Sequence, residues 1–599
     1  MPTRTLALIL LGLAARVSIA AEPWTIDALL ALPSVSDPQI APDGKSAAWV
    51  LRELSGDRYR STVVAGARRY PGSRPRWSRT GKLAWLAPDG RVMVEGKPTT
   101  QGAVSSFEWT PSGQIAYLAI DPPKSASDVI VADRDYRYSR LWLDGKLLTK
   151  ADHHVLSFDF AEGKAVYAAQ PTPRPRDSFH VDLYEIDLRT GTEKAIVTQL
   201  GRDGDPAYSP DGKWIAFHTQ AGSENYFSER HVALVPSGGG EIKILTKGLP
   251  LDVFRGGNRF GWRGDELLFA AGWHTRDNLY AVNRGTGTMR VVAEGISANG
   301  VSFTPDGSQA AFLKISNAHP PEVFHSNGSR LSNTYRDFAP MRTEVVKWKS
   351  KDGLDVEGVL WLPPSYTSGR IPLITELHGG PTGVTLEGFP NPRTYPTQAF
   401  LDAGVAIFSP NFRGSSNYGG DFRLKNSQSQ GFGDFDDVMT GIDTLVTRGI
   451  ADPDKLGVMG WSYGGYLTAW VIGHTNRFKA ASVGAPATDW TTYYGQSDGP
   501  REVLWTYFGG KPWDVPQNYQ RHSPRGGLPN VRTPTLLQVG ERDINHNAEI
   551  YQALTDLGVP VEYAVYPREG HGITEPAHQR DLMERNLRWF RRWLEKDQK

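Results

Sequence analysis

The sequence predicts an all-β domain followed by an α/β domain, and three observations lead to this. A chain of 599 residues is too long to fold around one hydrophobic core. A short turn motif recurs through the N-terminal half at the spacing of a four-stranded unit. From about residue 341 onward, strand-like and helix-like runs alternate, which is typical of an α/β domain.

The recurring motif consists of an aromatic or apolar residue, a turn that ends in Gly, and an apolar strand-like run. Its copies end at Gly44, Gly81, Gly113, Gly163, Gly212, Gly264 and Gly307, so they lie 37, 32, 50, 49, 52 and 43 residues apart. Glycine suits such hairpin turns because it adopts positive φ without strain. The spacing predicts an all-β seven-bladed propeller over residues 36–335, and an array of β-sandwiches is the alternative.

Residues 460–464 read Gly-Trp-Ser-Tyr-Gly and form a G-x-S-x-G motif. An apolar run that predicts a strand precedes the motif, and a run that predicts a helix follows it. In this context the serine sits on a sharp turn with its hydroxyl raised above a sheet. Gly460 and Gly464 leave room for the strand and the helix to approach each other. The sequence therefore predicts an α/β-hydrolase catalytic domain over residues 341–599, with Ser462 as the nucleophile.

A serine hydroxyl is a weak nucleophile at neutral pH, so it needs a base, and the base needs an orienting acid. In α/β-hydrolases the acid and then the histidine follow the serine along the chain. Asp543 and His571 each follow a strand-like run, where ligands bind in open α/β sheets. We predict a triad of Ser462, Asp543 and His571, with Glu541 as a rival acid and His546 as a rival base.

Acyl transfer also requires hydrogen-bond donors for the oxyanion. One donor is expected from the backbone N–H of Tyr463, the residue after the nucleophile. The second is expected from the loop that begins His378-Gly-Gly-Pro, and we assign it to the Gly380 N–H with His378 as an organiser of the loop. An ordinary tight turn is the alternative interpretation of this loop.

Residues 341–599 resemble the catalytic domain of the prolyl oligopeptidase family of serine peptidases. The motifs that carry the resemblance are His378–Pro381, Asn411–Gly420, Gly460–Tyr466, Gly484–Trp490, Gly509–Trp513, Gly540–Asp543 and Glu569–Gly572. They are most similar to the acylaminoacyl-peptidase and secreted dipeptidyl-peptidase-like branch. The resemblance implies that the matching Ser, Asp and His form the triad, and that a propeller caps the site and limits it to short peptides.

The same resemblance implies an exopeptidase that releases dipeptides or N-acylated amino acids. An esterase that uses the same triad remains an alternative, because the triad does not distinguish an amide from an ester. A non-catalytic propeller scaffold is the third hypothesis. Related enzymes are often dimers, so a homo-oligomer is a further implication.

Four residues are candidates for substrate binding, and His378 of the loop described above is one of them. Asn545 follows the acid by two residues, as does an Asn in dipeptidyl peptidase IV that binds the P2 carbonyl; a helix N-cap is the alternative. Tyr493 and Trp490 fall where related enzymes line the S1 pocket with aromatic side chains, and core packing is the alternative for Trp490.

Composition excludes several classes of partner. A net charge of +1, from 66 basic and 65 acidic residues, gives no reason to expect nucleic acid binding. The absence of cysteine excludes disulfides and thiolate metal sites. The proposed chemistry needs neither a metal nor an organic cofactor.

The first twenty residues predict a signal peptide. A short segment with Arg4 precedes an apolar run over residues 6–15, and Ser18-Ile-Ala20 has the small-x-small pattern of a cleavage site. We therefore expect an exported protein, periplasmic or secreted, that begins near Ala21. Residues 21–35 are expected to pack near the hydrolase domain. No later apolar run is long enough to predict a membrane span.

Overall fold

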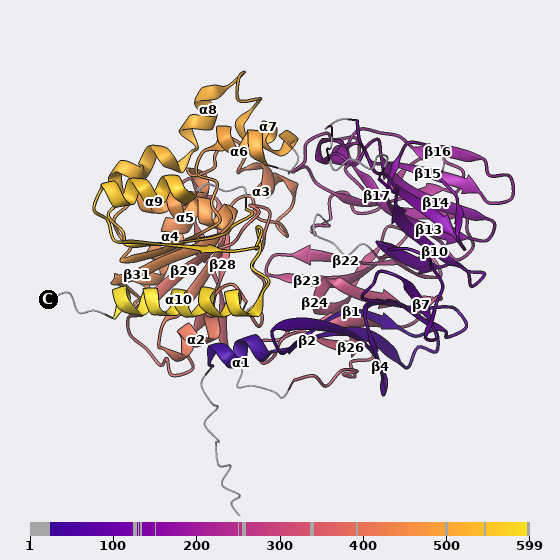
Figure 1. Cartoon of the computed structure of the whole chain (residues 1–599), viewed down its shortest axis with the longest axis horizontal. Coiled ribbons are helices and arrows are strands. Elements are labelled where there is room, and N and C mark those ends of the chain that lie inside the picture. The colour runs from indigo at the N-terminus through magenta and orange to yellow at the C-terminus, as the bar shows by residue number, and fades with distance from the viewer. Residues whose placement is uncertain are drawn as a thin grey trace, which may run out of the picture.

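The computed structural model describes residues 24–123, 129, 131, 134–149, 151–249, 251–253, 259–335, 341–390, 393–497, 501–543 and 547–595, with the backbone alone at 501–502. Two domains lie side by side (Figure 1). The N-terminal domain consists of antiparallel sheets, and the C-terminal domain is a sheet flanked by helices. The predicted signal peptide lies outside the described residues.

Each of the first five sheets of the N-terminal domain has four strands in chain order. These are β1 (Ser34–Ile40), β2 (Ala47–Ser55), β3 (Arg58–Ala65), β4 (Arg68–Pro71); β5 (Ser73–Trp77), β6 (Leu83–Leu86), β7 (Val92–Val94), β8 (Lys97–Pro98); β9 (Ser106–Trp109), β10 (Ile115–Ile120), β11 (Ser139–Leu143), β12 (Lys146–Leu147); β13 (His154–Ala161), β14 (Lys164–Gln170), β15 (Asp182–Asp187), β16 (Glu193–Val197); and β17 (Asp203–Tyr208), β18 (Trp214–Thr219), β19 (His231–Pro236), β20 (Lys243–Ile244). A short 3-10 helix, η1 (Pro175–Phe179), lies between β14 and β15.

The sixth sheet has six strands in chain order. They are β21 (Gly261–Arg263), β22 (Glu266–Trp273), β23 (Arg276–Asn283), β24 (Met289–Phe303), β25 (Ala310–Lys314) and β26 (Glu322–His325).

The prediction of seven blades is wrong, because the described residues form a six-bladed propeller. All seven predicted turns do occur, and the Gly that ends each of them has positive φ and lies between two paired strands. The last two units are continuous through the 15-residue strand β24, which pairs with β23 along its first part and with β25 along its second. Ile296 pairs with both neighbours, so no break separates a seventh sheet.

The C-terminal domain contains an eight-stranded sheet. Its order is β27 (Arg342–Lys349), β28 (Asp355–Leu362), β30 (Ala406–Asn411), β29 (Ile371–Leu377), β31 (Ala451–Trp461), β32 (Ala480–Gly484), β33 (Thr535–Gly540) and β34 (Val561–Tyr566). The strands from β30 to β34 are parallel, and β27 and β28 pair antiparallel at one edge. The carboxyl ends of the parallel strands therefore meet at one edge, where α/β folds bind ligands.

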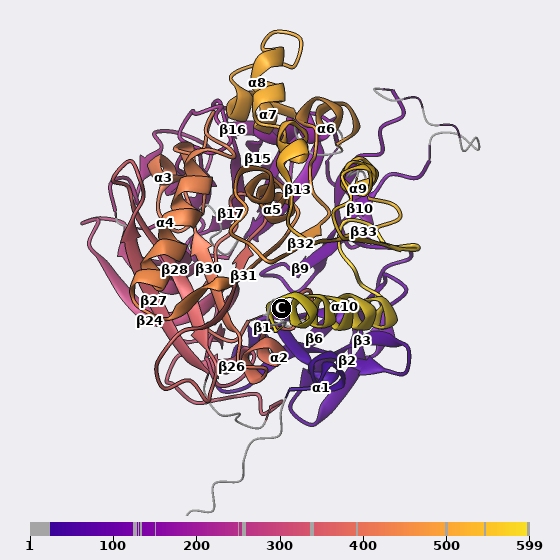
Figure 2. The same cartoon turned by 90° about the vertical axis from the view of Figure 1, so that its left-hand side faces the viewer.

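Helices cover both faces of this sheet (Figures 1 and 2). They are α2 (Thr397–Asp402), α3 (Gly420–Leu424), α4 (Gly433–Thr447), α5 (Tyr463–His474), α6 (Trp490–Gln496), α7 (Arg501–Phe508), α8 (Pro516–Arg521), the 3-10 helix η2 (Pro524–Asn530), α9 (Asn547–Asp556) and α10 (Pro576–Leu594). Helices α4 and α5 share one apolar core with the sheet, and α10 and α2 share another on the opposite face.

The N-terminal helix α1 (Ile26–Ala31) belongs spatially to both domains. Thr25 caps the helix by accepting a hydrogen bond from the Ala28 N–H, as an N-cap residue does. Leu29 and Leu30 are buried in a cluster with Met583 of α10, and both views place α1 beside α10 (Figures 1 and 2). No helix among the described residues is long and apolar enough to cross a membrane.

A buried ion pair and further polar contacts join the propeller to the hydrolase domain. Arg423 of α3 forms an ion pair with Asp252, and both side chains are almost fully buried. Asp252 also accepts a hydrogen bond from the Asn417 N–H at 2.9 Å. On the same side, His274 Nδ1 lies 3.0 Å from Glu357, and this contact is partly open to solvent. The two domains are therefore connected by a buried ion pair and by a half-exposed polar contact.

Candidate active site

Ser462 lies on a sharp turn between β31 and α5. Its φ of 62° and ψ of −120° are strained for a non-glycine residue, as expected for a nucleophile elbow. A Cβ at Gly464 would collide with the Leu377 carbonyl oxygen, and one at Gly460 would collide with the Gly464 carbonyl. Only glycine at both positions lets the strand and helix approach closely enough to form this turn.

Asp543 and His571 form a hydrogen-bonded pair at the same edge of the sheet. Asp543 follows β33 and His571 follows β34, and His571 Nδ1 lies 2.9 Å from Asp543 Oδ2. The Asp543 side chain is 1% exposed, whereas that of His571 is 52% exposed. The Trp461 indole donates a hydrogen bond to the His571 carbonyl at 2.8 Å and so joins this loop to the residue before Ser462.

The rival residues have other partners or lie outside the described part of the chain. Glu541 accepts a hydrogen bond from the Arg568 N–H at 2.8 Å. His546 and the proposed substrate clamp Asn545 fall outside the described residues. His522 is buried, and its Nδ1 contacts the Gln430 carbonyl; burial lowers the pKa of its imidazole, which suits a structural role.

The loop after β29 lies directly against the nucleophile. A Cβ on Gly379 would lie 3.4 Å from Ser462 Cβ, so this loop passes within van der Waals contact of the turn. Gly380 has a φ of +122°, which strongly favours glycine. The Tyr463 N–H opens α5, where the first N–H groups have no partner within the helix. Gly380 and Tyr463 both line the cavity beside Ser462.

The side chain of Tyr463 is held by buried polar groups. Its hydroxyl donates to Asp434 at 2.7 Å and accepts from the Asn426 amide at 3.0 Å. Asp434 is fully buried at the start of α4, and burial raises the pKa of its carboxyl to about 7. Tyr463, the residue after the nucleophile, is thereby held in place through its backbone in α5 and through its side-chain hydroxyl.

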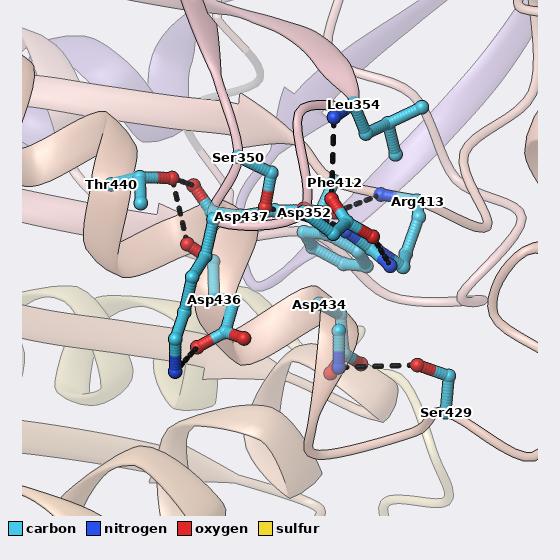
Figure 3. Close-up of polar contacts among 12 residues, drawn as sticks. Ser350, Asp352, Leu354, Phe412, Arg413, Ser429, Asp434, Asp436, Asp437 and Thr440 are labelled. Carbon is cyan, nitrogen blue, oxygen red and sulfur yellow. Dashed lines mark hydrogen bonds and ion pairs between the residues drawn. The ribbon is translucent and has the colours of Figure 1, made fainter.

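Arg413 anchors the loop that faces His378. Its guanidinium bonds Asp437 at 2.7 Å and Asp352 at 2.9 Å (Figure 3). Burial alone would lower the pKa of Arg413, but the two carboxylates raise it, so the side chain stays charged. The pair with Asp437 ties the end of β30 to α4.

A cavity of about 220 Å³ opens beside Ser462. Trp490 and Tyr493, both predicted to line a substrate pocket, contribute to its wall. Trp490 also packs in the core, since its indole donates to the His522 carbonyl and it is 4% exposed. Both interpretations of Trp490 are therefore consistent with its position.

Two propeller residues that the sequence did not indicate also line this cavity. Tyr226 and Phe227 reach it from the segment between β18 and β19, and Phe227 stacks on Tyr507 of α7 with ring centroids 4.5 Å apart. No local pattern marks them, because their role depends on how the two domains dock.

Among the described residues, Glu569, Glu575 and His578 have the spacing of metal ligands. They already bond one another and their surroundings: His578 Nδ1 lies 2.9 Å from Glu569, and Arg568 forms an ion pair with Glu575. Glu569 also accepts the Glu575 N–H at the start of α10. This cluster therefore fixes the His571 loop to α10.

Comparison with known proteins agrees with this geometry. Residues 393–597 match the prolyl oligopeptidase family. This part of the chain therefore belongs to a family of serine peptidases. The chain is 27% identical to the uncharacterized peptidase YuxL of Bacillus subtilis over 95% of this chain and 99% of that protein. It is also 26% identical to dipeptidyl-peptidase 5 of Porphyromonas gingivalis, over 70% of this chain and 63% of that protein.

The fold of the whole peptidase also has a solved counterpart. The acylaminoacyl peptidase of Pyrococcus horikoshii superimposes with a TM-score of 0.82 at 21% identity, covering 96% of this chain and 98% of that chain. At this identity the likeness concerns the fold. It extends across both domains, whereas the family match lies within the catalytic domain.

Proposed function

We propose that this peptidase is an exopeptidase that hydrolyses short peptides through Ser462, His571 and Asp543. The observation that carries the proposal is the His571–Asp543 hydrogen bond at the sheet edge that also holds the strained Ser462. The chain order of Ser462, Asp543 and His571, each after a strand of the sheet, is the order that α/β-hydrolases use and supports the assignment.

In the proposed mechanism Ser462 Oγ attacks the scissile carbonyl. Because His571 Nδ1 bonds Asp543, its Nε2 takes the hydroxyl proton and later gives it to the leaving amine. Asp543 holds the imidazole tautomer and stabilises the imidazolium. The N–H groups of Gly380 and Tyr463 hold the oxyanion, and water then hydrolyses the acyl-enzyme with His571 as base.

The pocket supports a preference for an apolar or aromatic P1 residue. Its wall combines Trp490, Tyr493 and Tyr507 with Phe227 and Tyr226 of the propeller. Aromatic walls of this kind favour an apolar side chain by removing its surface from water. Because both domains contribute, the pocket is complete only when they are docked.

The propeller supports a restriction to short substrates. It encloses a cavity of about 1880 Å³ lined by the inner strands of its sheets. Arg259, just before β21, bonds Glu108 of β9 at 2.9 Å, and Glu108 also bonds Arg76 at 2.7 Å. The first ion pair connects blades that are distant in the chain, and the second connects consecutive blades. The blades around the cavity are thereby held together, so a folded protein could not enter it.

A panel of peptides, each with a free and an N-acetylated N-terminus, tests the proposal when the products are identified by mass spectrometry. Release of dipeptides from free N-termini alone would identify a dipeptidyl peptidase. Release of acetylated residues from blocked peptides would identify an acylaminoacyl peptidase. Cleavage at internal bonds of long peptides would contradict an exopeptidase.

The matched control is the folded Ser462→Ala variant, which should lose at least about 10⁴-fold in kcat. An esterase would instead hydrolyse esters while leaving every peptide of the panel intact. Hydrolysis that survives in Ser462→Ala would contradict the assignment of the nucleophile.

We also propose that the protein is exported after cleavage near Ala20, on the basis of the sequence pattern alone. N-terminal sequencing of the full-length chain expressed in a Gram-negative host should find a mature protein that begins at Ala21 outside the cytoplasm. A cytoplasmic protein that retains the first twenty residues would contradict export.

A further inference from the structure

The peptide unit between Gly379 and Gly380 connects His378 to the proposed oxyanion site. Its N–H belongs to Gly380, the proposed donor, and its carbonyl oxygen belongs to Gly379. That oxygen accepts the Gly383 N–H at 3.1 Å and lies 3.0 Å from His378 Nδ1. An amide is conjugated, so a donor at its oxygen polarises the N–H on its other side.

The second ring nitrogen of His378 faces Ser415, which has a single hydroxyl proton. Ser415 Oγ lies 2.6 Å from the Phe412 carbonyl oxygen and 2.9 Å from His378 Nε2. A carbonyl oxygen can only accept, and an oxygen–oxygen distance of 2.6 Å requires a proton between the atoms. The Ser415 hydroxyl therefore donates its hydrogen bond to the Phe412 carbonyl. Ser415 Oγ is then left to accept a hydrogen bond from a proton on His378 Nε2.

Both ring nitrogens of His378 thus face acceptors. We propose that His378 is an imidazolium, and that it is a positioning residue whose charge-assisted hydrogen bond to Gly379 orients and polarises the Gly380 N–H for the oxyanion. The proposal rests on the proposed function for the role of Gly380. Charge-assisted hydrogen bonds are roughly twice as strong as neutral ones, so the charge matters more than the contact alone.

Neither neutral tautomer fits these distances. With the proton on Nε2, the Nδ1 lone pair would face the Gly379 oxygen at 3.0 Å. With the proton on Nδ1, the Ser415 proton would have to serve both Nε2 and the Phe412 oxygen. Each tautomer leaves two acceptors in contact without a proton between them, which costs free energy at these partly buried groups.

The surroundings of the ring suit a fixed cation. The Phe412 ring stacks on His378 with centroids 4.3 Å apart and planes 14° apart, and an aromatic face attracts a cation. Ser415 is fully buried, and Arg413 holds the intervening chain through Asp437. A Cβ at Gly383 would lie 2.7 Å from His378 Nδ1, so only glycine leaves room for this arrangement.

The protonation state can be read directly from the full chain labelled with ¹⁵N-histidine. A two-bond ¹H–¹⁵N correlation spectrum at pH 8, assigned by comparison with His378→Asn, should show both His378 nitrogens protonated. Ser415→Ala removes the acceptor at Nε2, so His378 should become neutral there at the same pH. One unprotonated nitrogen on wild-type His378 at pH 8 would overturn the proposal.

Kinetics test the consequence for catalysis. His378→Asn replaces the cation with a neutral amide donor, and kcat on a peptide nitroanilide should fall about tenfold with KM nearly unchanged, because the oxyanion forms only in the transition state. Ser415→Ala should lower kcat in the same way. Unchanged kcat in both variants would overturn the positioning role. The spectrum reports the protonation state of His378 whether or not the protein is active. Failure of the proposed function would show separately, as hydrolysis that survives in Ser462→Ala.

Discussion

The two sides of the candidate site are built differently. The nucleophile side consists of Ser462, the loop of Gly380 and the start of α5, and Tyr463 there is 5% exposed and bonded to the buried Asp434. The base side consists of loops after β33 and β34, where the His571 side chain is 52% exposed. The Asp543 side chain of that side is 1% exposed.

The nucleophile side contains groups that fix the position of backbone donors, whereas the base side contains the group that transfers protons. On the nucleophile side the donors are backbone N–H groups, so their geometry depends on buried anchors such as Arg413 and Asp434. On the base side one hydrogen bond orients an imidazole that is open to solvent. Substitutions at the anchors should therefore change stability as well as rate, whereas substitutions at the base side should change rate alone.

Asp543→Asn should have the largest effect on the base side. An amide can hold His571 only in the wrong tautomer, so kcat should fall about 10⁴-fold while the unfolding midpoint stays close to that of the wild type. Steady-state kinetics measure the loss in kcat, and thermal unfolding measures the midpoint. Glu541→Gln is the control at the rival acid, and a comparable loss there would show that the acid has been assigned to the wrong residue.

Arg413→Leu should have the largest effect on the stability of the nucleophile side. It leaves Asp437 buried and unpaired, which costs about 3–5 kcal/mol in the free energy of unfolding. Denaturant unfolding measures the loss. As the control, Arg91→Leu breaks an exposed ion pair with Asp89 and should leave the free energy of unfolding almost unchanged. An equal loss of unfolding free energy in the two variants would contradict the claim that the buried ion pair stabilises the fold more than the exposed one.

Phe227→Ala should weaken the pocket without touching the triad. It removes one aromatic wall, so kcat/KM for substrates with an aromatic P1 residue should fall about tenfold, mainly through KM. Substrates with Ala at P1 provide the internal control, because they fill less of the pocket. A uniform fall for both substrates would indicate a disturbed domain interface instead of a specificity wall.

Asp434→Asn should flatten the pH dependence of stability. Burial raises the pKa of Asp434 to about 7 from an ordinary 3.8, so between these values the folded state holds a proton that the unfolded chain has released. The stabilisation that this bound proton gives the folded state is fully present below about pH 4 and is lost as the pH rises to about 7. Unfolding midpoints at pH 5, 6 and 7 should therefore fall less steeply in the variant, and an identical slope would contradict the shifted pKa.

Local patterns in the sequence predicted the parts of the fold that depend on local turns. The seven Gly turns lie at hairpins because an Asp-Gly or similar pair specifies a turn by itself. The predicted number of blades was wrong. The strand β24 pairs with β23 and with β25 and so joins two predicted blades into one sheet, and no local pattern indicates this. The G-x-S-x-G turn and the Asp543–His571 contact were predictable because each follows a strand in a fixed chain order.

Residues whose role depends on docking or burial could not be predicted in this way. Phe227 and Tyr226 join the pocket from another domain, and Asp434 reaches Tyr463 from the start of α4. Charged residues in a sequence give no indication that folding will bury them. The two interpretations of Trp490 both remain predictions, since this residue both packs in the core and lines the cavity.

The most direct test of the central claim is covalent labelling of the purified protein with a fluorophosphonate, followed by peptide mapping. We predict one adduct, on Ser462, formed at a rate that falls sharply in Asp543→Asn and absent in Ser462→Ala, with peptide hydrolysis lost in proportion to labelling. Labelling at another serine with hydrolysis lost, or full hydrolysis after Ser462 is labelled, would contradict the assignment of Ser462 as the nucleophile.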